Sequence, residues 1–194
     1  MGIHESQSLF WESHVVSSRA FLKKLYPKIQ SVSDGYLDEV SFEDFYVYYN
    51  YITQSLIRIE GDELSYPLHI IIRYEIERDL FNGVMSFDDL ESVWNAKYQE
   101  YFGKAPSTSK EGFMEDIHWS EAMFGYFPTY LIGRIYASQI ESELKKRLPN
   151  FDELLLEHNV APALEILREN IYAPASLHTT TETIQNFTGS KLDS

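Results

Sequence analysis

The chain contains no cysteine among its 194 residues, which excludes disulfide bonds and zinc sites built from thiolates. It also has no apolar run near the roughly 20 residues that a membrane-spanning helix needs. The N-terminus lacks the basic segment followed by an apolar segment that marks a secretory signal peptide. Together these absences predict a cytoplasmic protein without a membrane partner.

Basic residues are few: 16 Lys and Arg stand against 30 Asp and Glu, which gives a net charge of −14. A field of this sign repels phosphate backbones, so we expect no nucleic-acid partner. The sequence also lacks a glycine-rich dinucleotide loop, a phosphate-binding P-loop and the Gly-x-Ser-x-Gly turn of serine hydrolases. Any chemistry must therefore come from other polar groups.

Helical periodicity dominates what is present, and 44% hydrophobic residues are enough for a globular core. We predict a mainly α fold with one small β-hairpin in residues 55–66, where β-branched residues flank a Gly-Asp pair. The predicted helices cover residues 5–25, 41–52, 65–81, 86–102, 120–148, 151–158 and 161–171, and the tail 173–194 is expected to hold at most one short helix, near 182–186.

Proline affects two of the predicted helices. The first helix is expected to end at Leu25, because the residue before Pro27 avoids the α region. The long helix from Ser120 to Leu148 contains a proline and a glycine, Pro128 and Gly133, at which we expect it to kink.

A histidine and a carboxylate, His4 and Glu5, stand at the start of the first predicted helix. They suggest part of a metal site, because imidazole and carboxylate are common metal ligands. Acidic and hydroxyl residues are also favoured at helix starts by capping and by the helix dipole, so the pattern alone leaves both interpretations open.

Three polar residues, His69, Arg73 and Glu77, are spaced by four along the helix predicted for residues 65–81. This spacing places them on one helix face. The stripe is either solvated, with a weak Arg–Glu pair, or it faces a cleft in which Arg73 grips a carboxylate through its planar guanidinium.

The most unusual stretch covers residues 112–130, where an acidic pair precedes His118 and an aromatic turn carries Tyr126 and Tyr130. A histidine and a tyrosine can stabilise the negative charge that develops on a carbonyl oxygen. The alternative is an aromatic segment of the core.

Taken together, the segments HESQ, LHIIIRYEIE, GFMEDIHWS and FGYFPTY, in this order, resemble the carboxypeptidase Taq family of metallocarboxypeptidases. The resemblance extends from Gly2 to about Gly189. The family's segments are His-Glu-x-x-His, His-Glu-Ser-Gln, Ile-Arg-x-x-Ala-Asp and Gly-x-x-Gln-Asp-x-His-Trp. Residues 72–77 match the third segment with Ile for Ala and Glu for Asp, and residues 112–119 match the fourth with Glu115 for Gln.

The resemblance implies zinc, or another divalent metal such as cobalt or manganese, with Glu5 as its third protein ligand. It implies an enzyme that releases single residues from peptides with a free C-terminus, using a zinc-activated water. The predicted substrate-binding residues are Arg73 and His69. His118 and Tyr130 would stabilise the oxyanion, with Tyr126 as the alternative to Tyr130.

The chain contains no His-Glu-x-x-His, since no two of its six histidines are four residues apart. The resemblance places that helix before Met1. We therefore interpret residues 1–194 as the C-terminal portion of one catalytic domain, in a long helical protein with a deep cleft that is typically a cytoplasmic homodimer. A catalytic zinc needs three protein ligands, so we expect the chain alone to bind zinc weakly and to be inactive.

Two alternatives stay open at this point. The chain could be a non-catalytic binding or scaffolding remnant that retains the cleft wall but not the metal. It could also be an acidic helical interaction module that shares only the fold.

Overall fold

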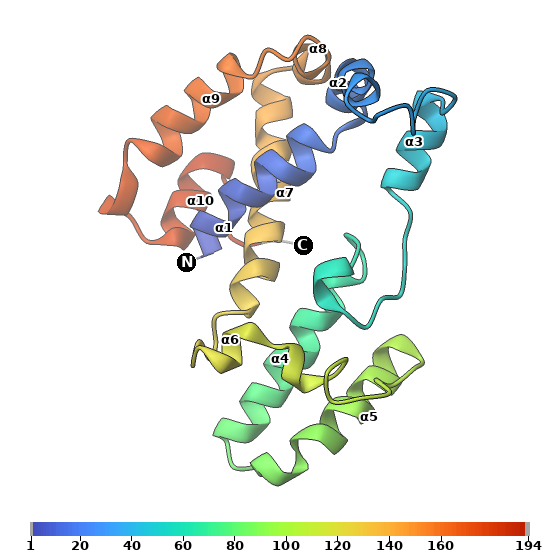
Figure 1. Ribbon diagram of the computed structural model, residues 1–194. Helices are drawn as coiled ribbons and strands as arrows, with labels where there is room; N and C mark the ends of the chain where they lie inside the picture. Colours follow the sequence, from blue (N-terminus) through green and yellow to red (C-terminus); the bar gives the residue numbers. More distant parts are fainter. Residues whose placement is uncertain (1, 193–194) are drawn as a thin grey trace. The chain divides into compact units, whose positions relative to one another are not determined.

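The computed structural model describes residues 2–192, and within them every regular element is a helix (Figure 1). The mainly α prediction is confirmed. The chain divides into two compact units, residues 1–49 with 132–194 and residues 50–131, hereafter the first and second units. No helix within residues 2–192 is both long and apolar enough to cross a membrane.

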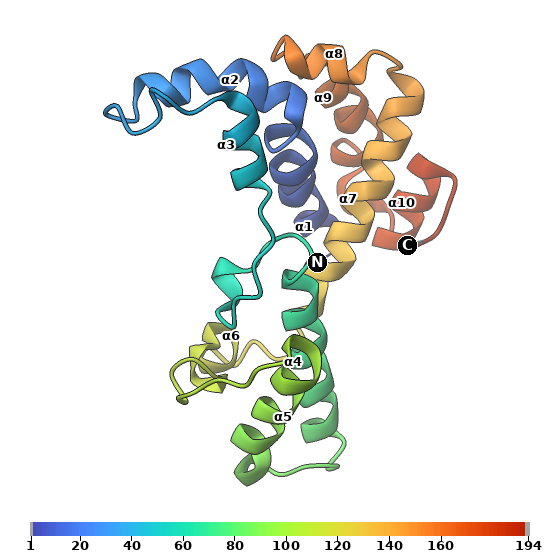
Figure 2. The same ribbon diagram turned by 90° about the vertical axis from the view of Figure 1, so that its right-hand side faces the viewer.

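The first unit contains the N-terminal and C-terminal helices. Its core joins apolar side chains from both ends of the chain, among them Phe10, Ile140 and Phe187. Figures 1 and 2 show α1 beside α7, and α2 beside α8. Its elements are α1 (Gly2–Leu9), the π-helix η1 (Phe10–Val16), α2 (Arg19–Ser31), α3 (Phe42–Tyr49), most of α7 (Pro128–Arg147), α8 (Phe151–Leu156), α9 (Ala161–Leu167), the π-helix η5 (Arg168–Tyr172), the 3₁₀ turn η6 (Ala175–Leu177) and α10 (Thr180–Thr188).

The second unit is built on the α4–α5 pair, which lies side by side in both views (Figures 1 and 2). Its core includes Ile72, Ile76 and Trp94, all fully buried. Its elements are the 3₁₀ turn η2 (Arg58–Glu60), α4 (Tyr66–Phe81), the 3₁₀ turn η3 (Phe87–Asp89), α5 (Leu90–Phe102), the 3₁₀ turn η4 (Phe113–Glu115), α6 (Ile117–Ser120) and the first residues of α7.

The boundaries of α4 and α5 follow the sequence signals. Pro67 lies in the first turn of α4, and a capping box between Ser86 and Asp89 precedes α5. The helix α5 ends at Phe102 and is followed by Gly103, whose φ of 71° is the left-handed conformation that glycine adopts freely. These predicted boundaries are confirmed.

The single helix predicted for residues 5–25 is wrong. Ser18 has an extended backbone, and its hydroxyl accepts a hydrogen bond from the Phe21 amide, so a new helix starts there. This helix, α2, continues past Pro27. Buried Tyr26 donates a 2.6 Å hydrogen bond to the Val40 carbonyl, and such tertiary contacts outweigh the local cost of the proline.

The predicted hairpin is also wrong, because no residue of the described segment around Gly61 forms a strand. The Asp62 carboxylate instead accepts hydrogen bonds from the backbone amides of Thr53, Leu64 and Ser65, at 2.8–2.9 Å. Asp side chains that bind nearby amides in this way stabilise tight turns, because they occupy backbone amides that a β-hairpin would pair between strands. Here the turn leads into α4.

The long helix predicted for residues 120–148 is divided. The short α6 ends at Ser120, and α7 begins at Pro128. Between them Ala122 and Gly125 have positive φ values of 56° and 74°, which are incompatible with a right-handed helix. Pro128 is therefore a helix start, where its missing amide costs nothing, and not a kink.

Candidate active site

The stripe on α4 is buried. The exposed fractions are 0% for His69, 0% for Arg73 and 5% for Glu77. A solvated stripe is therefore excluded. Buried polar groups need partners, and each of these side chains has them within the second unit.

Arg73 forms a buried ion pair with Asp116, from its Nε to the carboxylate. The guanidinium also lies against the rings of Trp94, at 4.7 Å, and Phe127, at 4.9 Å. Burial alone would raise the pKa of Asp116, but the charge and the hydrogen bond of Arg73, with the Trp119 amide, lower it below its ordinary value. Asp116 is therefore held as a carboxylate at the start of α6.

A hydrogen-bonded chain runs from Arg73 through Tyr98 to His69. Arg73 Nη1 donates to the Tyr98 hydroxyl at 3.3 Å, and that hydroxyl lies 2.8 Å from His69 Nδ1. Since a guanidinium only donates, the Tyr98 oxygen accepts from Arg73, and the tautomer of His69 sets which atom donates in the bond between Tyr98 and the imidazole. Burial, together with the charge of Arg73, lowers the pKa of His69 to about 4, so the ring is neutral at pH 7.

The imidazole of His118 lies among tyrosines. Its Nε2 is 3.3 Å from the Tyr130 hydroxyl, and its ring stacks on Tyr126 with centroids 5.7 Å apart. Its Nδ1 is 3.8 Å from Asp116. Burial lowers the pKa of His118 below its ordinary value, although Asp116 opposes this. The structure thus brings together the three predicted catalytic residues, and a neutral imidazole beside a phenol can donate to an oxyanion.

Glu5 lies in the first unit, on α1, and is partly exposed. The helix packs so closely on α7 that a β-carbon at Gly133 would come within 2.7 Å of Glu5 Cβ. Within residues 2–192, no three His, Asp or Glu side chains converge as ligands of one metal ion. The described residues therefore do not by themselves form a catalytic zinc site.

Three residues of the network carry roles that the sequence reasoning missed. Asp116 is the partner of Arg73, and Tyr98 joins Arg73 to His69. Glu77 binds the Trp119 indole and the Gly125 amide. Asp116 stands in a segment that the family resemblance singled out, whereas no motif of the sequence marks Tyr98.

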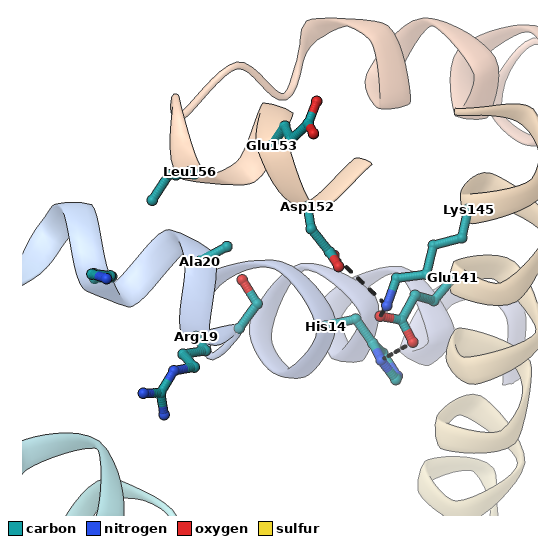
Figure 3. A pocket seen from close by; sticks show the side chains of 10 residues that line it. His14, Arg19, Ala20, Glu141, Lys145, Asp152, Glu153 and Leu156 are labelled. Carbon is teal, nitrogen blue, oxygen red and sulfur yellow. Dashed lines mark ion pairs between the residues drawn. The ribbon is translucent and has the colours of Figure 1, made fainter. Parts of the chain in front are cut away.

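A cavity of about 510 Å³ opens in the first unit, between η1, α2, α7 and α8 (Figure 3). Among its lining residues, Glu141 pairs with His14 and Lys145, both at 2.9 Å. The hydrogen bond from His14, with that from Lys145, lowers the pKa of Glu141 to about 2. Lys145 balances the negative charge of Glu141, and none of the predicted site residues lines the cavity.

Fold and site together define an all-helical protein with a histidine–tyrosine site, backed by a buried ion pair. The family described as carboxypeptidase Taq (M32) metallopeptidase matches residues 1–194. The chain belongs to this family.

The names of similar proteins agree with this family. The chain is 42% identical over 193 residues to carboxypeptidase 1 of Bacillus subtilis, and 38% identical over 189 residues to thermostable carboxypeptidase 1 of Thermus thermophilus. These matches cover 100% and 97% of this chain, but 38% and 37% of those proteins. The crystal structure of an M32 carboxypeptidase from Deinococcus radiodurans matches 99% of this chain and 39% of its own, at 32% identity and a TM-score of 0.94.

Proposed function

We propose that this chain is the part of a metallocarboxypeptidase that supplies the oxyanion-stabilising residues and one metal ligand, in an enzyme that releases single amino acids from peptide C-termini. The observation that carries the proposal is the position of His118, next to Tyr130 and Tyr126. In this role His118 and Tyr130 donate to the carbonyl oxygen as negative charge develops on it. Tyr126 is the alternative donor.

Glu5 is the proposed metal ligand, by resemblance, for zinc or another divalent ion such as cobalt or manganese. Because the 194 residues contain no His-Glu-x-x-His, we propose that this chain alone binds zinc weakly and releases no amino acids. For the whole protein we propose a cytoplasmic homodimer, also by resemblance.

The proposed substrate contact of Arg73 and His69 remains a prediction. Both side chains are fully buried, and Arg73 already pairs with Asp116. A direct contact with a peptide carboxylate requires that this pair open. The same pair, left closed, supports the start of α6, the short helix that carries His118.

The experiment joins this chain to the part of Bacillus subtilis carboxypeptidase 1 that it does not match. We expect the isolated chain to carry little zinc and no activity, and the chimera to release C-terminal amino acids. In the chimera, His118→Gln and Tyr130→Phe should each lower kcat by about 10²–10³, the usual effect of losing one oxyanion donor.

Tyr74→Phe is the matched control, since Tyr74 lies on α4 and is half exposed. Turnover by the isolated chain would contradict its proposed inactivity. A chimera that folds and binds zinc but releases nothing would favour the alternative, a non-catalytic binding remnant. Equal activity of the His118→Gln chimera would overturn the role given to His118.

A further inference from the structure

Glu77 joins three segments of the second unit through one carboxylate. Its Oε1 accepts from the indole Nε1 of Trp119 at 2.6 Å, and its Oε2 accepts from the Gly125 amide at 2.9 Å. The side chain is 5% exposed. One residue of α4 therefore holds both the end of α6 and the loop that follows it.

The two ends of α6 are both attached to α4, one helical turn apart. Arg73 binds Asp116, which caps the start of α6, and Glu77 binds Trp119 near its end. Positions four apart lie on the same face of a helix, so the two attachments act side by side. His118 lies between the two attached residues of α6.

The loop between α6 and α7 needs such an attachment. Ala122 has a φ of 56°, a conformation that costs energy for a residue with a β-carbon, and Gly125 has a φ of 74°. The loop nevertheless places Tyr126 so that its ring stacks on His118, with an interplanar angle of 18°. The bond from the Gly125 amide to Glu77 fixes the residue directly before Tyr126.

We propose that Glu77 is a positioning residue of the candidate active site, which holds Tyr126 against His118 by binding Trp119 and Gly125 at the same time. The importance of Glu77 for catalysis rests on the proposed function, but its effect on the position of Tyr126 is independent of that function. The role requires a carboxylate, because each of its oxygens accepts a hydrogen bond. A glutamine offers one acceptor and one donor group, so it can keep only one of the two bonds, and the bond that it keeps is weaker because the acceptor is no longer charged.

The test uses nuclear magnetic resonance on the isolated 194-residue chain and its Glu77→Gln variant. Losing a hydrogen bond to a charged group should accelerate exchange of the Gly125 amide by about 10- to 100-fold. We also expect the Trp119 indole proton to shift and the Overhauser contact between the His118 and Tyr126 rings to weaken. Glu75→Gln is the matched control: Glu75 is on the same helix but pairs with Lys97 and Tyr101.

Trp119→Phe keeps the test decisive if Glu77→Gln does not fold, because it removes the indole donor and leaves the Glu77 carboxylate in place to bind the Gly125 amide. We expect this variant to keep the Gly125 amide protected and to weaken the ring contact partly. An unchanged contact between His118 and Tyr126 in a folded Glu77→Gln or Trp119→Phe variant would overturn the proposal. So would equal effects of Glu77→Gln and Glu75→Gln.

In the active chimera, Glu77→Gln should lower kcat with little change in KM, since Tyr126 and His118 act on the transition state. The resonance measurements need neither metal nor substrate. A chimera without activity therefore rejects the proposed function and leaves the positioning role to be judged by the spectra alone.

Discussion

At the scale of single residues, the second unit contains a buried histidine that is kept neutral. His69 has no exposed surface, and its Nδ1 lies 2.8 Å from the hydroxyl of Tyr98. The Arg73 guanidinium donates to the same hydroxyl, so its positive charge is close. Protonating His69 therefore means placing a second positive charge beside Arg73 in the protein interior, which is unfavourable.

This neutrality predicts a loss of stability in mild acid. The pKa of His69 is about 4 in the folded protein and near its ordinary 6.5 when unfolded, so between these values the unfolded state binds more protons. Stability contributed by the neutral ring is complete above about pH 6.5 and falls as the pH drops toward 4. We expect the free energy of unfolding to fall by about 2 kcal/mol between pH 7.5 and pH 5, measured by urea denaturation.

The control for this prediction is His69→Gln, which cannot titrate. The variant should have a flatter dependence on pH over the same range, whatever its absolute stability. A wild-type chain whose stability is constant from pH 7.5 to pH 5, or a variant with the same slope, would contradict the buried neutral histidine.

Sequence reasoning recovered single residues unevenly, and the cause is physical. His118, Tyr126 and Tyr130 were predicted as neighbours because one short aromatic segment carries them, and the structure places them together. The ion pair between Arg73 and Asp116 spans 43 positions of the chain. Local spacing contains no information about such a pair, so it required the packed fold.

At the scale of elements, the contact between α1 and α7 depends on one glycine. A β-carbon on Gly133 would lie 2.7 Å from Glu5 Cβ and 3.0 Å from the Glu5 carbonyl carbon, closer than atoms can pack. The sequence predicts a kink at Gly133, whereas in the structure its missing side chain leaves space for α1. The missing side chain lets the backbone of α1, which carries Glu5, approach α7 directly.

Gly133→Ala should therefore destabilise the first unit despite the higher helix propensity of alanine. We expect a loss of about 1–3 kcal/mol in the free energy of unfolding, the usual cost of overpacking a tight contact. Ser142→Ala is the matched control, because Ser142 lies on the exposed side of α7 and should change stability by less than about 0.5 kcal/mol. Equal or greater stability of Gly133→Ala would show that α1 is not tightly packed there.

Helix boundaries also fall into two groups, those that local chemistry sets and those that tertiary contacts set. Those set by local chemistry, such as the Ser86 capping box and Gly103, agree with the sequence. Those set by tertiary contacts do not: α2 passes Pro27 while the buried Tyr26 is hydrogen-bonded to Val40. The Gly-Asp pair at residues 61–62 illustrates a second cause, since the same residues suit a hairpin turn and an Asp-capped turn equally well.

At the scale of the whole molecule, two features have opposite effects on the association of one copy of the chain with another. The net charge of −14 makes copies of the chain repel one another. Large hydrophobic side chains are nevertheless exposed, among them Tyr36 at 88%, Tyr48 at 81% and Val47 at 68%. The matched relatives are more than twice as long as this chain. Their solubility therefore depends on a different surface from the one that this chain exposes alone.

This balance predicts self-association that strengthens as salt is added. The Debye length falls from about 30 Å at 0.01 M salt to about 8 Å at 0.15 M, so repulsion between copies is screened while apolar contacts persist. We expect sedimentation velocity to show mainly monomer at low salt and concentration-dependent association at higher salt. Val47→Ser with Tyr48→Ser should reduce this association, whereas Gln54→Ser, at an exposed neutral residue, should not. Association that weakens with added salt would instead indicate contacts between opposite charges, and the exposed apolar residues of α3 would not be its cause.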